Sequence, residues 1–199
     1  MALVSFSLLC MFVSALLFSH TDAAKEEHEN ITKNMPGPWE FLTNGTIYLY
    51  SSSKFLNVTC IRAKAIKTNK STNTSTYDVL VKWADNDKQM NFSASCVLLK
   101  TEKGVKIFTP ADEGKIAVTN YTFLLTTRHC AVVAKSEGIP GADALESTEL
   151  WVKNPSVTKN IITCYKEFTH VCNCNGHPTW YSAIQCEQDE VRRRLAPNC

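Results

Sequence analysis

Hydrophobic and polar residues alternate along most of the chain from residue 46 onward. Short stretches rich in β-branched and aromatic residues follow one another, and clusters of Ser, Asn, Asp, Thr and Gly separate them. Alternation with a period of two is typical of half-buried strands, and no helical pattern interrupts the series. We predict eight strands, at Thr46–Tyr50, Phe55–Ile66, Tyr77–Trp83, Met90–Leu99, Val105–Phe108, Ile116–Leu125, Ala131–Ala134 and Glu149–Val152.

The spacing of apolar residues changes after residue 154. From there they recur at helical intervals, which predicts a C-terminal α-helix through Ile161, Ile162, Tyr165, Phe168 and Val171. A turn at Met35–Trp39 leads into a short stretch that is expected to be helical or extended. The fold class is therefore all-β, and so many short antiparallel strands are typical of a barrel or a sandwich. A closed eight-stranded barrel has room for one small ligand.

The first 23 residues have the pattern of a secretory signal peptide. Met1–Phe18 is almost wholly apolar and uncharged, and the small residues Thr21 and Ala23 fit the positions that signal peptidase recognises. The apolar run is too short to span a membrane. We therefore expect a secreted, extracellular protein whose mature part, residues 24–199, is one domain with a cysteine-rich tail at 172–199.

Cysteines and sequons fit the same compartment. The chain has nine cysteines, of which Cys10 falls in the signal peptide, and the even set that remains predicts disulfides. The spacing of Cys172 and Cys174 does not match a zinc site, so no metal is expected. Seven Asn-x-Ser/Thr sequons predict N-glycosylation on surfaces that face water, at Asn30, Asn44, Asn57, Asn69, Asn73, Asn91 and Asn120.

The sequons also suggest which face of a strand lies inside, because side chains alternate between the two faces. If Asn120 faces outward, the residues expected to face inward are Thr119, Tyr121, Phe123 and Leu125. The same reasoning around Asn91 places three more inside, Met90, Phe92 and Ala94. A bulge would shift this alternation locally. The expected interior is mostly apolar and aromatic.

Three motifs in the C-terminal half, Cys130-Ala-Val-Val133, Glu149-Leu-Trp151 and Cys164, follow one another at characteristic gaps. This pattern resembles the signature of tick salivary lipocalins, the family that includes the histamine-binding proteins. Further counterparts in the family match Cys60, Cys186 and Trp39. The resemblance implies an eight-stranded antiparallel lipocalin barrel with a short N-terminal helix and a C-terminal α-helix.

The resemblance also implies two disulfides, Cys130–Cys164 and Cys60–Cys186, which would hold the C-terminal helix and the tail to the barrel. The other cysteines are additional to the family pattern. We expect Cys96 to pair with Cys199. Cys172 and Cys174 are expected to have different partners, because cysteines two positions apart rarely pair with each other.

Members of this family sequester small host mediators, so the resemblance implies a salivary protein that suppresses host inflammation or immunity. A biogenic amine such as histamine or serotonin would need carboxylates around its charge, because an unpaired buried charge is very costly. Where the family's amine binders have acids, this chain has Ala131, Tyr121 and Ser51, and only Glu149 remains. The interior therefore favours an eicosanoid, a fatty acid or a sterol, with amine binding as the alternative.

The predicted ligand contacts are one acid and six aromatic residues, Glu149, Tyr48, Tyr121, Trp151, Phe123, Phe92 and Trp39. An apolar pocket with few polar groups is the usual form of a small-molecule site. The apolar wall is expected to continue through Tyr50, Met90 and Leu125. Lys82 and Arg128 are the candidate cations for a ligand carboxylate, whereas Glu149 beside such a group favours a neutral lipid such as a sterol.

Two other classes of function remain. An immunomodulator that binds a host protein would use the stretches without sequons, Lys100–Lys115 and Cys172–Cys199. An enzyme is not expected, because the histidines at 129, 170 and 177 share no ligand spacing and no hydrolase or metalloprotease motif occurs. No cofactor is expected either. Charges of both signs are mixed, with a net charge of +2, so nothing indicates nucleic-acid binding.

Overall fold

Nine strands and two helices make up the described part of the chain, which in this computed structural model is residues 37–85, 88–101, 104–109, 118–138, 145–153, 161–172, 174 and 178–187. In chain order they are α2 (Pro38–Thr43), β1 (Thr46–Ser52), β2 (Val58–Asn69), β3 (Thr74–Trp83), β4 (Gln89–Thr101), β5 (Gly104–Thr109), β6 (Val118–Thr126), β7 (Cys130–Gly138), β8 (Leu145–Val152), α3 (Ile162–Val171) and β9 (Thr179–Trp180). A further helical turn covers residues 183–187. The predicted signal peptide and the sequon at Asn30 lie outside the described residues.

Every strand predicted from the alternation of hydrophobic and polar residues is present. Most of them are longer than predicted. The largest extensions are those of β7, which continues to Gly138 rather than Ala134, and of β8, which begins at Leu145 rather than Glu149. Helix α3 covers the predicted apolar stripe, and the short N-terminal stretch is the six-residue helix α2. The element order predicted from the sequence is therefore confirmed.

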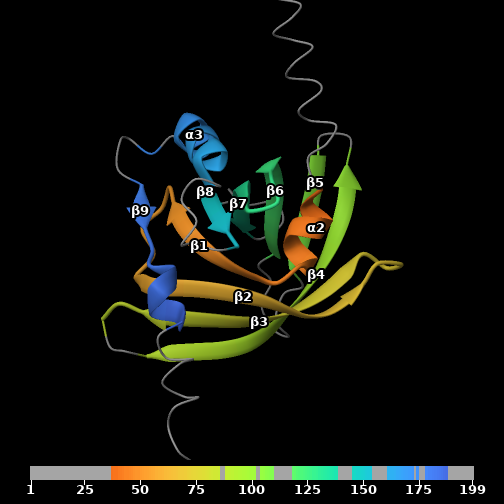
Figure 1. Cartoon of the computed structure of the whole chain (residues 1–199), viewed down its shortest axis with the longest axis horizontal. Coiled ribbons are helices and arrows are strands. Elements are labelled where there is room, and N and C mark those ends of the chain that lie inside the picture. The colour runs from red at the N-terminus through yellow and green to blue at the C-terminus, as the bar shows by residue number, and fades with distance from the viewer. Residues whose placement is uncertain are drawn as a thin grey trace, which may run out of the picture. The chain divides into compact units, whose positions relative to one another are not determined.

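The sheet closes on itself to form a barrel. Each strand from β1 to β8 pairs antiparallel with the next one along the chain, and β1 pairs with both β2 and β8. The short strand β9 pairs with β1 at Ser51 and Ser52, beyond the residues of β1 that pair with β2. Figure 1 shows the sheet curling from β2 and β3 round to β7 and β8. Closure selects the barrel over the sandwich that the alternation alone left open.

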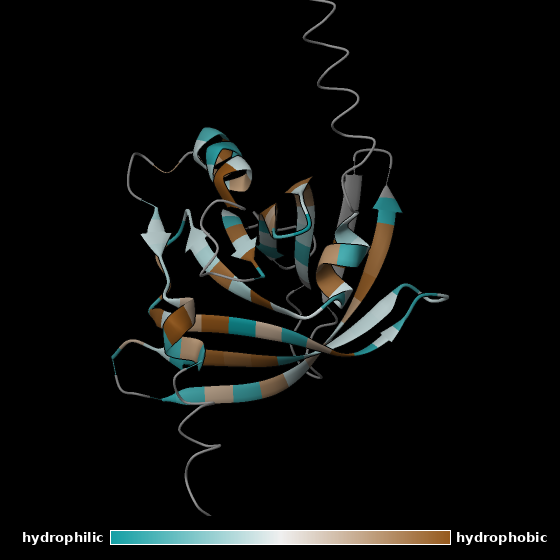
Figure 2. Cartoon of the chain, in the orientation of Figure 1, coloured by the Kyte–Doolittle hydropathy of each residue, from teal (hydrophilic) through white to brown (hydrophobic). Residues whose placement is uncertain are grey.

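The closed sheet has an apolar layer on each face, and hydrophobic residues are visible on α3 as well as along the strands (Figure 2). The inner cluster, inside the barrel, consists of Phe41, Leu42, Ile47, Ala63, Tyr77, Leu98, Ile107, Ala131 and Val133. The outer cluster, between the sheet and the C-terminal segments, consists of Tyr48, Cys60, Cys130, Val132, Leu150, Val152, Ile161, Cys164, Phe168, Cys172, Ala183 and Cys186. Neighbours such as Val132 and Val133 are therefore buried on opposite faces of one strand.

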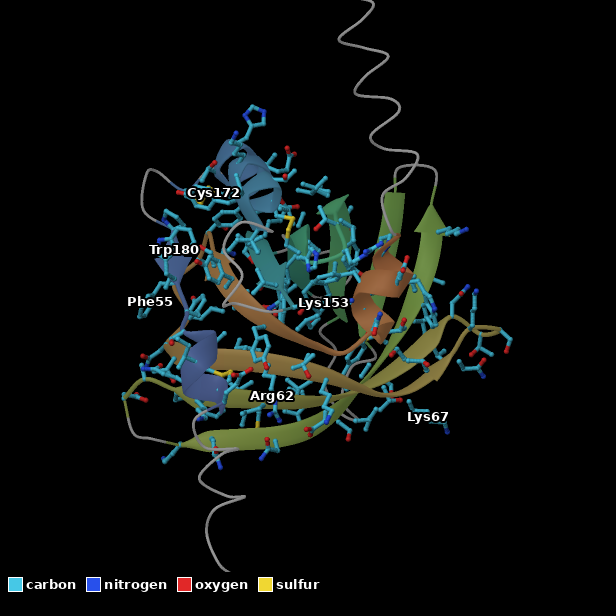
Figure 3. All side chains as sticks on the ribbon, in the orientation of Figure 1. Phe55, Arg62, Lys67, Lys153, Cys172 and Trp180 are labelled. Carbon is cyan, nitrogen blue, oxygen red and sulfur yellow. A yellow bond between two sulfur atoms is a disulfide. The ribbon has the colours of Figure 1, made fainter. Side chains whose placement is uncertain are left out.

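Helix α2 lies across one end of the barrel. It contacts β2 on one side of the ring and β6 and β7 on the other, and it buries Phe41 and Leu42. Pro38 occupies its first turn, where the missing N–H costs no helical hydrogen bond. Lys153, directly after β8, places its ammonium 5.4 Å from the centre of the Phe41 ring and donates to the carbonyl of Glu40 at 3.2 Å (Figure 3). These contacts hold the helix over the interior.

Disulfides hold the C-terminal segments against the outer face of the barrel. Cys130–Cys164 joins β7 to α3, and Cys60–Cys186 joins β2 to the helical turn at 183–187. These are the two pairs that the resemblance implies. The hydroxyl of Tyr48 on β1 also donates to the carboxylate of Glu187 at 2.8 Å. The tail is thus attached to two neighbouring strands of the barrel.

Cys172 and Cys174 pair with each other, so the expectation of different partners is wrong. Cys172 is the residue at which α3 ends, and the chain bends there, so the two Cα atoms are 5.1 Å apart. That separation is within the usual range for a disulfide. Cys96 has no disulfide partner among the described residues, and its expected partner, Cys199, lies outside them.

Most sequon asparagines in the described part of the chain are exposed, namely Asn44, Asn57, Asn69, Asn73 and Asn91. Asn120 is half-buried, and its side-chain oxygen is enclosed without a hydrogen-bond partner among the described residues. A glycan requires an asparagine that faces water. The five exposed sites meet that requirement, and their glycosylation stays a prediction.

We predict that Cys130→Ala with Cys164→Ala lowers the free energy of unfolding by about 3 kcal/mol, because the unfolded chain then gains the freedom that this cross-link removes. The bond spans 34 residues, whereas Cys172–Cys174 spans 2. Replacing the second pair by alanines should therefore cost much less. Urea titrations followed by tryptophan fluorescence measure both losses. Equal losses would contradict this account of the two bonds.

Candidate functional site

A cavity of about 700 Å³ lies inside the barrel, and residues from all eight barrel strands and from α2 line it. Its volume is within the range of small-molecule sites. Most of the wall is aliphatic or aromatic, from Phe41, Leu42, Ile47, Ile61, Ala63, Tyr77, Val79, Val81, Phe92, Ala94, Ile107, Phe123, Val133 and Trp151. The rest of the wall comes from Ser93, Ser95, Cys96, Thr119, Tyr121, Lys135, Glu137 and Glu149.

The structure places five of the seven predicted ligand contacts in the cavity wall, namely Glu149, Tyr121, Trp151, Phe123 and Phe92. On β6 the alternation inferred from Asn120 holds for Thr119, Tyr121 and Phe123. On β4, Phe92 and Ala94 line the cavity as expected, but Ser93 and Ser95 between them line it too, and Met90 does not.

Tyr48, which was predicted to contact a ligand, does not line the cavity. It belongs to the outer cluster, and its neighbour Ile47 takes the inward position on β1. The sequence could not distinguish the two residues, because the outer face of β1 is also apolar where the C-terminal segments cover it. Tyr50 packs against the same outer cluster.

Leu125 and Trp39 are also placed differently from the prediction. The pairing of β6 with β7 shifts between Phe123 and Leu125, and this irregularity turns Leu125 to the outer cluster. Trp39 lies on α2 at the edge of the inner cluster but not in the cavity wall. Phe41 and Leu42 of the same helix line the cavity instead.

The polar cluster of the cavity consists of Tyr121, Lys135, Glu137, Glu149 and Trp151, on the adjacent strands β6, β7 and β8. Glu149 is only 2% exposed. One of its carboxylate oxygens accepts a hydrogen bond from the Trp151 indole at 2.8 Å, and the other lies 3.7 Å from the Lys135 ammonium. Lys135 also forms an ion pair with Glu137, and its ammonium is 5.9 Å from the centre of the Tyr121 ring.

Burial and neighbouring charges change the pKa values in the polar cluster. Burial raises the pKa of the Glu149 carboxyl, although Lys135 and the Trp151 indole oppose that rise. Burial would lower the pKa of Lys135, but the carboxylates of Glu149 and Glu137 outweigh it and raise that pKa. Burial also raises the pKa of Tyr121 well above its ordinary value, and the same two carboxylates add to the effect. At neutral pH Lys135 is therefore an ammonium and Tyr121 a neutral hydroxyl.

Lys135 and Glu137 are the charged site residues that the sequence prediction missed. The strand was predicted to end at Ala134, before these two residues. Lys135 and Glu137 nevertheless continue the inward-facing positions of Ala131 and Val133, and this period of two is the signal that could have found them.

The cations that were predicted instead lie elsewhere. Lys82 donates to the backbone carbonyl of Gln185 at 2.6 Å, and Arg128 is exposed. Neither residue lines the cavity.

Cys96 and Tyr77 lie side by side in the inner wall of β4 and β3. Burial raises the pKa of the Cys96 thiol to about 11. It also raises the pKa of Tyr77 to about 12, with a smaller contribution from Cys96 and an opposing one from Ser75. Both groups therefore present neutral polar atoms to the cavity at physiological pH.

Within the described ranges no group of three or more His, Cys, Asp or Glu residues is arranged to hold a metal ion. No helix in the described part of the chain is both long enough and apolar enough to cross a membrane.

No family model matches the sequence, and no curated protein matches it significantly. Solved structures are similar in fold. Lobster apocrustacyanin A1 aligns with a TM-score of 0.53 and 10% identity, over 75% of this chain and 81% of that one. Apocrustacyanin C1 aligns with a TM-score of 0.53 and 9% identity, over 79% and 88%. Identities this low show the fold alone, and that fold is the lipocalin barrel.

We predict that Cys96 reacts slowly with iodoacetamide in the folded protein. With a pKa of about 11, about one thiol in a thousand is ionised at pH 8, and the thiolate is the reactive form. Mass spectrometry of the labelled peptide should show a rate at least about 100-fold below that in denaturant. A rapid reaction of the folded protein would contradict the raised pKa. A thiol that stays unlabelled in denaturant would show that Cys96 is in a disulfide, as its expected pairing with Cys199 requires.

We predict that the stability of the wild-type protein relative to Glu149→Gln falls as the pH rises above 4.5, the ordinary pKa of the group. A carboxyl with a raised pKa keeps its proton in the folded state at pH values where the unfolded chain has lost it, so the free energy of unfolding falls through that interval. Urea titrations between pH 4 and pH 7 measure the difference. Glu146→Gln, at an exposed position of the same strand, is the control. A difference that does not change with pH would rule out a raised pKa for Glu149.

Proposed function

We propose that this chain is a secreted carrier that sequesters a small hydrophobic molecule in its barrel. The candidate ligands are eicosanoids, fatty acids and sterols, and the carrier would act as a tick salivary lipocalin that suppresses host inflammation or immunity. The observation that supports the proposal most strongly is the largely apolar cavity of about 700 Å³. The salivary assignment rests on the motifs at Cys130, Glu149–Trp151 and Cys164.

The size and the lining of the cavity suit a lipid of modest length. Apolar ligands bind chiefly because their surface leaves water. For ligands of drug size, about −0.3 kcal/mol per heavy atom is a typical yield, so a ligand of about 25 heavy atoms would bind with about −7.5 kcal/mol. That value corresponds to a dissociation constant of a few micromolar. Phe92, Phe123 and Trp151 supply flat apolar surface for such a ligand.

The polar cluster would orient the ligand within the apolar wall. Both oxygens of Glu149 already face partners within the protein. Lys135 and Tyr121 can donate to a ligand, because the Lys135 ammonium has three N–H bonds and no described residue hydrogen-bonds the Tyr121 hydroxyl. A ligand with an oxygen at one end and a hydrocarbon body would satisfy both parts of the site.

A biogenic amine is the second candidate ligand. Two carboxylates, Glu137 and Glu149, and the ring of Tyr121 lie together in the cavity wall. Such a combination can stabilise an organic ammonium. Amine binding is the weaker of the two proposals, because the ammonium of Lys135 already lies among these groups.

We predict that the protein binds the neutral fluorescent probe N-phenyl-1-naphthylamine and that lipids extracted from the purified protein displace it. Ala94→Trp should weaken probe binding by at least about tenfold, because the new side chain would occupy the cavity that Ala94 lines. Leu124→Trp is the matched control, since this side chain is exposed on β6 and does not line the cavity. Fluorescence titration measures both affinities.

Failure of the wild-type protein to bind the probe would contradict the carrier function. Equal affinity in the two tryptophan variants would show that the probe binds outside the cavity. If the cavity binds no ligand, the remaining hypothesis is an immunomodulator that binds a host protein. Capture experiments with variants in the stretches without sequons would then address it.

A further inference from the structure

The ammonium of Lys135 occupies the centre of the polar cluster. It lies against the carboxylate of Glu137, 3.7 Å from an oxygen of Glu149 and 5.9 Å from the centre of the Tyr121 ring. Two carboxylates and an aromatic face are the partners that a buried organic ammonium requires. The chain therefore contains the surroundings of an amine site, with one of its own side chains inside them.

We infer that Lys135 fills an ammonium subsite of the barrel and is the residue that sets the charge preference of the cavity. With Lys135 in place, the cavity excludes amines and accepts neutral ligands that carry a hydrogen-bond acceptor. This inference rests on the proposed carrier function, and it narrows the candidate ligands to neutral ones such as sterols, because fatty acids and eicosanoids carry a carboxylate at neutral pH.

Backbone pairing fixes the walls of this subsite. Tyr121 on β6 lies directly opposite Lys135 on β7, and Glu149 on β8 lies opposite Val133, one inward position before Lys135. Glu137 is the next inward position of β7. Because three adjacent strands hold these groups, removing the lysine side chain leaves the carboxylates and the ring in position.

The charges of the cluster decide between classes of ligand. A second ammonium would meet the positive charge of Lys135 at close range. A ligand carboxylate would add a third negative group beside Glu137 and Glu149. A neutral carbonyl or hydroxyl avoids both of these charge repulsions. It can accept hydrogen bonds from the ammonium N–H that faces neither carboxylate and from the Tyr121 hydroxyl.

The first test compares three ligands that share one indole ring. Tryptamine is a cation, tryptophol is neutral and indole-3-propionate is an anion at pH 7. Calorimetry on the wild-type protein should show tryptophol binding at least about tenfold more tightly than either ion. Tryptamine binding as tightly as tryptophol would overturn the inference without any variant.

The second test removes the lysine. Lys135→Met should raise the affinity for tryptamine by at least about tenfold, and adding Glu149→Gln should reverse the gain. Lys135→Arg keeps the positive charge and should continue to exclude tryptamine. Lys67→Met is the matched control, since Lys67 is exposed on β2 away from the cavity wall (Figure 3). A folded Lys135→Met protein, verified by circular dichroism, that gains no affinity for tryptamine would overturn the inference.

The two tests separate this inference from the carrier function. A wild-type protein that does not bind N-phenyl-1-naphthylamine would contradict the carrier function. Even then, a gain or absence of tryptamine binding in Lys135→Met would show whether Lys135 fills an ammonium subsite. If Lys135→Met does not fold, the relative affinities of the wild-type protein and of Lys135→Arg for the three indole ligands test the inference instead. Absence of charge discrimination in both tests overturns the inference.

Discussion

The barrel depends on strand β1, which hydrogen-bonds to β8 along one edge and to β2 along the other. The pairing with β2 covers only Thr46 to Tyr48, whereas β2 and β3 pair along almost their full lengths. Without this short seam the sheet would be an open ribbon with two free edges. The tail strengthens the seam from outside, because Cys186 is bonded to β2 through Cys60 and Glu187 accepts a hydrogen bond from Tyr48 on β1.

The same closure explains which parts of the structure could be predicted. Alternation identified the eight strands of the barrel but not the two-residue strand β9. It succeeds there because a half-buried strand must place apolar residues on one face. It did not reveal which face was inside where both faces are covered. Tyr48 and Ile47 are equally buried, one against the C-terminal segments and the other in the cavity. Only the three-dimensional path of the tail separates them, and no local pattern encodes it.

The sequence did not predict the polar cluster, for a related reason. Three polar residues in a row after Ala134 indicate the end of a buried strand, yet Lys135 and Glu137 continue it on the inside because each has a charged partner there. A buried charge is tolerated only when such partners exist. The partners of Lys135 are Glu137, two positions further along β7, and Glu149 on the neighbouring strand β8.

Helix α2 has a consequence for the time a bound molecule would stay in the barrel. A ligand that leaves through the covered end must wait for the helix to move, and this movement exposes Phe41 and Leu42 and breaks the contacts of Lys153. Exposing two such side chains costs about 4 kcal/mol, which slows escape about a thousandfold. At that end the opening of this six-residue helix adds its own barrier to the one that the ligand's contacts with the wall already set.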